Sequence, residues 1–127
     1  MFKRDLDFER KWQTLIRSLH QSIGTKPKDL NSVLFLIGVQ ELGSGTRRFS
    51  KEEKQDLMHI AICKVLSLSG YYKLEGLDKD GWPHWKLAKR LPHFDLLEQE
   101  KLLKMHVLEY FEKEHDWSFE QDVPEKE

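Results

Sequence analysis

The most apolar stretch of the chain lies near its middle, where nine of the twelve residues from Leu57 to Leu68 are apolar. Ser50 and Glu53 precede it with the spacing of a capping box, in which each side chain satisfies a backbone N–H of the first helical turn. The pattern predicts a helix over about residues 51–68. Because this helix is apolar on nearly every side, we expect neighbours to cover it and place it at the centre of the fold.

Two other segments show helical patterns with clear ends. From about Asp5 to Ile23 the apolar residues fall on one helical face; they are Phe8, Trp12, Leu15, Ile16, Leu19 and Ile23. Near the C-terminus, Asp95 and Glu98 repeat the capping-box spacing ahead of a segment with a wide apolar arc. This segment predicts a helix that ends at about residue 114.

Residues 30–42 are ambiguous, because Val33 to Ile37 is a continuous apolar run that suits either a buried strand or a buried helix. The length of the segment favours a helix, and Asp29 is available as an N-terminal cap. Gly38 inside a helix costs up to about 1 kcal/mol, which suggests that it allows close packing against a neighbour.

Two short runs flank the turn residues 78–81, which end in Asp-Gly, and together they predict a β-hairpin over about residues 71–88. Alternation along the strands divides the side chains between two faces. The face expected to join the core holds Tyr72, Leu74, Trp85 and Leu87. The outer face holds Tyr71, Lys73, Glu75, Trp82, His84 and Lys86.

These elements predict a mainly α (α+β) fold in which four helices and one hairpin form a single domain over residues 1–127. A chain of this length can bury one core. Residues 115–127 form an acidic tail that we expect to fray after Phe119, with Trp117 and Phe119 holding its first part.

Composition excludes several classes of protein. The net charge of −1 provides no overall attraction to nucleic acid or to an anionic membrane. Cys63 is the single cysteine, which excludes an internal disulfide framework and fits a reducing compartment. No apolar run is long enough to span a membrane, and the N-terminus does not resemble a secretory signal. We therefore expect a cytoplasmic protein.

A metal site is the first chemical hypothesis. His59 and Cys63 are four residues apart on the central helix, with Asp56 one turn earlier, so all three could point the same way. Cysteine and histidine are ligands that zinc accepts. No Cys-x-x-Cys or His-Glu-x-x-His spacing is present, however, and buried cysteine is common as a small apolar residue. The structural interpretation is favoured, and no cofactor is predicted.

Nucleic-acid binding is an alternative, because helices followed by a hairpin are also the order of elements in a winged helix. The helix before the wing would need a basic exposed face, yet its first turn holds Glu52 and Glu53 beside Lys51 and Lys54. Lysines on the hairpin keep this alternative open.

At residues 38–43, 49–63 and 70–85, the runs GVQELG, FSKEEKQDLMHIAIC and GYYKLEGLDKDGWPHW resemble a small family of uncharacterised bacterial proteins. The resemblance covers about residues 38–111. It implies a bacterial cytoplasmic origin and carries over no catalytic or binding residue.

No catalytic constellation is visible, since the histidines are scattered and no pair of acids is set apart by spacing. We therefore predict a non-enzymatic module that self-associates or binds a protein partner.

Exposed Trp and Tyr side chains often mark binding sites, so the predicted contact residues lie on the outer hairpin face. They are Tyr71, Lys73, Trp82, His84 and Lys86. The opposing interpretation is that the tail or the first helix covers this face. A small-ligand or metal-binding domain using His59 and Cys63 is a second alternative.

Overall fold

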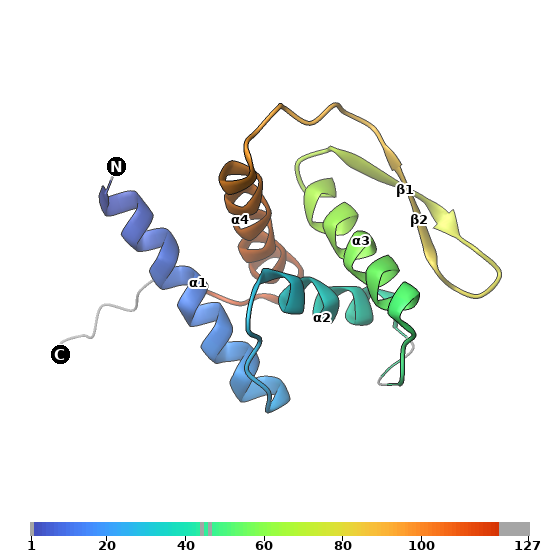
Figure 1. Ribbon diagram of the computed structural model, residues 1–127, viewed down its shortest axis with the longest axis horizontal. Helices are drawn as coiled ribbons and strands as arrows, with labels where there is room; N and C mark the ends of the chain where they lie inside the picture. The colour runs from blue at the N-terminus through green and yellow to red at the C-terminus, as the bar shows by residue number, and fades with distance from the viewer. Residues whose placement is uncertain (1, 44, 46, 120–127) are drawn as a thin grey trace.

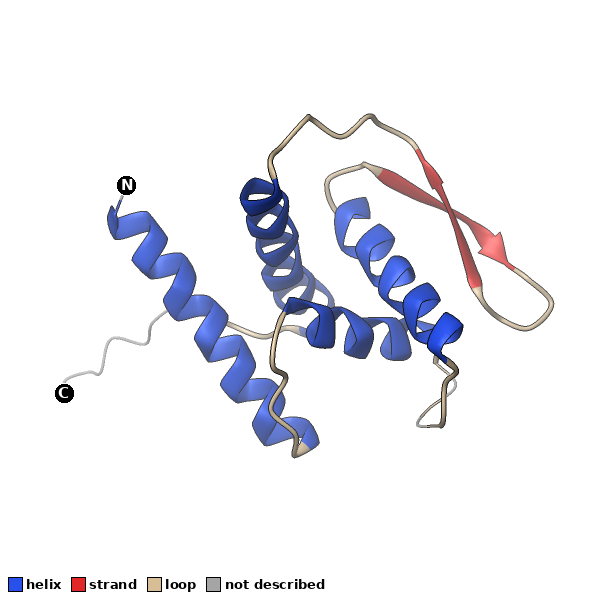
Figure 2. Ribbon diagram, viewed as in Figure 1, coloured by secondary structure: helices blue, strands red, loops and turns tan. Residues whose placement is uncertain are grey.

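A computed structural model describes residues 2–43, 45 and 47–119. Along the chain the elements are α1 (Phe2–Ile23), α2 (Leu30–Leu42), α3 (Lys51–Ser67), β1 (Tyr72–Leu77), β2 (Pro83–Leu87) and α4 (Leu96–His115). Figures 1 and 2 show α1 at one end of the molecule and the antiparallel hairpin at the other, with α3 and α4 between them. The predicted mainly α (α+β) fold is confirmed, and the ambiguous segment 30–42 is a helix.

The helices begin where the sequence places their caps. The Ser50 hydroxyl accepts the Glu53 N–H at 3.1 Å while the Glu53 carboxylate accepts the Ser50 N–H at 2.9 Å, which completes the capping box of α3. Asp95 and Glu98 form the same arrangement at α4. At α2, Asp29 accepts the Ser32 N–H at 2.9 Å. These bonds satisfy amides that a helix start leaves free.

The contact between α2 and α3 depends on a glycine. A Cβ atom at Gly38 would overlap the backbone carbonyl of Leu57, and Gly38 is buried. The absence of a side chain therefore lets the two helix backbones approach closely. α3 also contacts α4 and both strands, so it joins the helices to the hairpin as expected of the central helix.

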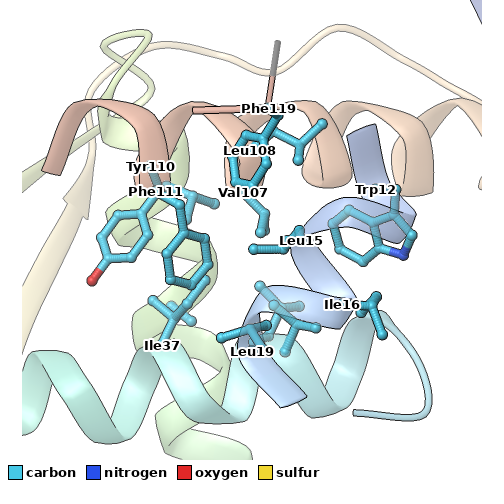
Figure 3. Close-up of a cluster of buried hydrophobic side chains, with 14 of the residues drawn as sticks. Trp12, Leu15, Ile16, Leu19, Ile37, Val107, Leu108, Tyr110, Phe111 and Phe119 are labelled. Carbon is cyan, nitrogen blue, oxygen red and sulfur yellow. The ribbon is translucent and has the colours of Figure 1, made fainter. Parts of the chain in front are cut away.

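The main core draws on all four helices, and Ala61, Val65 and Leu66 are the members from α3. Figure 3 shows how apolar side chains of α1, α2 and α4 meet within it. Its members include Trp12, Leu15, Ile16, Leu19, Ile37, Val107, Leu108, Tyr110 and Phe111. The chain after α4 contributes as predicted: Trp117 stacks on Phe111 with ring centroids 4.8 Å apart, and Phe119 is 2% exposed. The remaining tail prediction falls on 120–127, outside the described residues.

The hairpin pairs Tyr72 with Leu87 and Leu74 with Trp85, so the predicted core-side residues do share one face. The prediction that all of them are buried is wrong, because Leu74 is 52% and Leu87 53% exposed. α3 contacts both strands, yet it leaves about half of each of these two side chains exposed. The face is therefore only partly covered.

Candidate functional site

The outer hairpin face presents charge more than aromatic surface. Lys73, His84 and Lys86 are exposed, and Trp82 is half-buried. The imidazole Nε2 of His84 lies 3.0 Å from the carboxylate of Asp78, which also accepts the Trp82 N–H at 3.0 Å. The hydrogen bond from His84, followed by that from Trp82, lowers the pKa of Asp78. These bonds hold the turn in shape and tie His84 to it.

Tyr71 does not belong to this face, which corrects the sequence-based assignment. It is half-buried against the core, with its ring centroid 6.5 Å from that of His106 on α4. The Lys89 ammonium lies 4.6 Å from the Tyr71 ring centroid, which is within cation–π range. Tyr71 comes before the first strand residue, so the strand alternation that predicted its direction does not apply to it.

The proposed metal ligands come together only in part. The Sγ of Cys63 and the Nε2 of His59 are 3.5 Å apart, whereas Asp56 is exposed. Cys63 is fully buried, and burial raises the pKa of its thiol to about 11. Within the described ranges, no group of three or more His, Cys, Asp or Glu residues could hold a metal ion.

A feature that sequence reasoning missed is an open groove of about 1200 Å³ over α2. Phe35, Leu36 and Val39 provide apolar lining from the side of α2 turned away from its buried residues. Three lysines also line the groove; they are Lys26, Lys28 and Lys54. Lys26 and Lys54 have no ion pair within the described part of the chain. The groove thus combines apolar and cationic surface.

The groove follows from the composition of α2. An ordinary surface helix has one apolar stripe and one polar side. α2 instead has apolar residues all around, so packing against α3 on one side and the main core on another leaves a third apolar side half-exposed. The apolar run over residues 33–37 was the available signal. This run indicated that α2 is buried, but it did not show how many sides of the helix the rest of the chain covers.

A polar cluster connects α2 to the end of α4, next to the groove. The Tyr110 hydroxyl donates to the Glu41 carboxylate at 2.6 Å, and the His115 Nε2 lies 3.1 Å from the same hydroxyl. Because the hydroxyl hydrogen is directed to Glu41, the His115 Nε2 must carry the proton of the second bond. Burial, together with the hydrogen bond to Glu41, raises the pKa of Tyr110 well above its ordinary value.

Lys64 adds a cation to this cluster, with its ammonium 3.9 Å from Glu41 and 3.4 Å from Glu114. Glu41 and Tyr110 are 69 positions apart, so no local spacing could have predicted their contact. Tyr110 and His115 line the groove. The partners of this cluster hold one another in place, so Tyr110 and His115 form a fixed part of the groove wall.

The chain matches no protein-family model, and the searches of curated proteins and of solved structures found no match to it. The resemblance to a bacterial family therefore stays a prediction. Among the described helices, none combines the length and apolar character that crossing a membrane requires.

Proposed function

We propose that the protein is a non-enzymatic interaction module that binds an amphipathic helix of a partner protein in the groove over α2. The observation that carries this proposal is the third, half-exposed apolar side of α2. Burying an apolar side chain contributes about 1.5–3 kcal/mol relative to leaving it in water. Phe35, Leu36 and Val39 are already half-buried, so a partner that covers them gains only a fraction of this energy from each side chain.

The charges around the groove specify the kind of helix. A helix that lays its apolar face into a groove places polar residues along both borders. The lysines lining this groove favour acidic residues at those borders, which improve association rate and orientation more than final affinity. We therefore expect a partner helix with an apolar stripe bordered by Asp and Glu.

The test is a selection of peptides from a displayed library of helical sequences, using the wild-type protein as bait. Each selected peptide is then titrated against Leu36→Lys, which places a charge in the groove, and against Gln13→Lys. Gln13 is exposed on α1 and does not line the groove, so the second variant matches the charge change. Circular dichroism confirms that both variants are folded.

We expect peptides with apolar stripes and acidic borders that lose binding to Leu36→Lys and keep it to Gln13→Lys. A selection in which every peptide binds both variants equally, or a library that yields none, would contradict the proposal. Sedimentation of the protein alone addresses self-association. If the wild type forms dimers that Leu36→Lys dissociates, the occupant is a second copy of the chain instead.

A further inference from the structure

Two lysines face each other across the hairpin. Lys73 on β1 and Lys86 on β2 are direct register partners, and both side chains are exposed. Opposite residues in an antiparallel pair have Cβ atoms about 4.5–5.5 Å apart, and like charges at that spacing destabilise the sheet. Neither ammonium group has an ion pair in the part of the chain that the structure describes. The hairpin therefore contains an electrostatic repulsion that the described residues do not relieve.

The neighbouring charged groups are already engaged or lie out of register. The Lys89 ammonium donates to the Ser69 carbonyl at 2.9 Å and contacts the Tyr71 ring. His84 is held by Asp78 at 3.0 Å. Glu75, the nearest acid in sequence, sits where a bulge shifts the register between Leu74 and Gly76. Among the residues that the structure describes, Lys73 and Lys86 are therefore available on this face to bind an external anion.

We propose that the outer hairpin face binds an acidic segment of a partner polypeptide, with two of its carboxylates reaching Lys73 and Lys86. Acidic residues three or four positions apart on a helix lie about 5–6 Å from each other, which matches the spacing of opposite strand residues. Binding such a pair converts the repulsion between the lysines into two attractions. This inference is independent of the α2 groove, which these lysines do not line.

The charge around the hairpin favours a polypeptide over a nucleic acid. α3 packs against both strands, and its exposed residues include Glu52 and Asp56. A duplex docked along the hairpin and α3, as in a winged helix, would bring its phosphates toward these acids. The net charge of −1 adds no general attraction for a polyanion. A local pair of cations suits a short acidic segment better.

The test uses fluorescence anisotropy with a labelled ten-residue glutamate peptide as the probe and a labelled short DNA duplex as the alternative. The proteins are the wild type, Lys86→Glu, and the control Lys79→Glu. Lys79 is an exposed lysine in the turn of the same hairpin, so the control makes the same charge change away from the lysine pair. Thermal unfolding of all three proteins is measured in parallel.

We expect Lys86→Glu to weaken peptide binding by at least about tenfold, and Lys79→Glu to weaken it by much less. We also expect Lys86→Glu to raise the melting temperature above that of Lys79→Glu, because an opposite-charge pair replaces a like-charge pair. If the two lysines served only to keep the protein soluble, Lys86→Glu would not both weaken peptide binding and raise the melting temperature.

Equal weakening by the two variants would overturn the proposal, as would a lower melting temperature for a folded Lys86→Glu. Preferential binding of the duplex that is lost in Lys86→Glu would assign the face to nucleic acid instead. If Lys86→Glu fails to fold, Lys73→Glu reverses the other charge of the pair and carries the same expectations.

Discussion

The backbone of α3 at Leu57 lies so close to Gly38 on α2 that a Cβ atom at Gly38 would overlap the Leu57 carbonyl. In an open helix, replacing glycine by alanine stabilises by up to about 1 kcal/mol. Here the same change forces apart two helix backbones, because the overlapping atom belongs to the backbone and not to a flexible side chain. This contact fixes how α2 is placed, and thereby which of its sides faces the groove.

Gly38→Ala should therefore destabilise the protein, by about 1–3 kcal/mol from overpacking. Chemical denaturation gives the free energy of unfolding, and Gln40→Ala, at an exposed position of the same helix, is the matched control. We expect the control to change stability by less than about 0.5 kcal/mol. A stabilising Gly38→Ala would show that the helices are farther apart than described.

Tyr110→Phe removes the hydroxyl that links Glu41 and His115. At neutral pH we expect a loss of about 1–3 kcal/mol, because the Glu41 carboxylate and the His115 N–H lose a partner at a partly buried site. Tyr71→Phe is the control, since its hydroxyl has no hydrogen bond in the described part of the chain. If both variants lose the same stability, the cluster is not a supporting wall of the groove.

The raised pKa of Tyr110 also predicts a pH dependence. The folded pKa lies above the unfolded value near 10, so its stabilising effect is complete below pH 10 and is lost as the pH rises beyond it. The wild type should therefore lose more stability than Tyr110→Phe between pH 9 and pH 11, a window of about one unit around the unfolded value. Parallel pH profiles for the two proteins would contradict this linkage.

The Asp29 carboxyl group predicts the opposite pH dependence, which is a loss of stability as the pH falls. The Ser32 N–H holds the pKa of its carboxyl below the ordinary value of 3.8, so its contribution is present above that pH and is lost as the pH falls through the folded pKa. Asp29→Asn keeps a capping side chain that does not titrate. Denaturation at neutral pH and in acid should show a smaller acid loss for this variant. Asp80→Asn, in the hairpin turn, serves as the carboxyl control.

Cys63 should be inert in the folded protein. Burial raises the pKa of its thiol from about 9 to about 11, which lowers the thiolate fraction at neutral pH by about a hundredfold, and the side chain is not exposed. A disulfide reagent should label it slowly in the native state and rapidly in denaturant. Rapid labelling of the native protein would indicate an accessible, activated thiol and would revive the His59–Cys63 site hypothesis.

Much of the fold could be predicted because its signals are local. The Ser50–Glu53 and Asp95–Glu98 capping boxes set helix starts through bonds that span three residues. The candidate site depends instead on how many sides of α2 find a neighbour, and on the meeting of Glu41 with Tyr110 across 69 positions. Leu74 and Leu87 illustrate why local patterns do not predict burial. Strand alternation correctly placed both residues on one face, but it did not show that α3 covers that face only in part.

The central claim is that the third side of α2 is a binding surface, and methyl NMR tests it most directly. A peptide selected by the wild-type protein is titrated into protein with labelled Leu and Val methyl groups. We predict that the signals of Leu36 and Val39 shift with the peptide, while those of Leu74 and Leu87 on the hairpin stay in place. If the hairpin methyl signals shift and the α2 signals do not, the partner binds the hairpin and the claim for the groove is wrong.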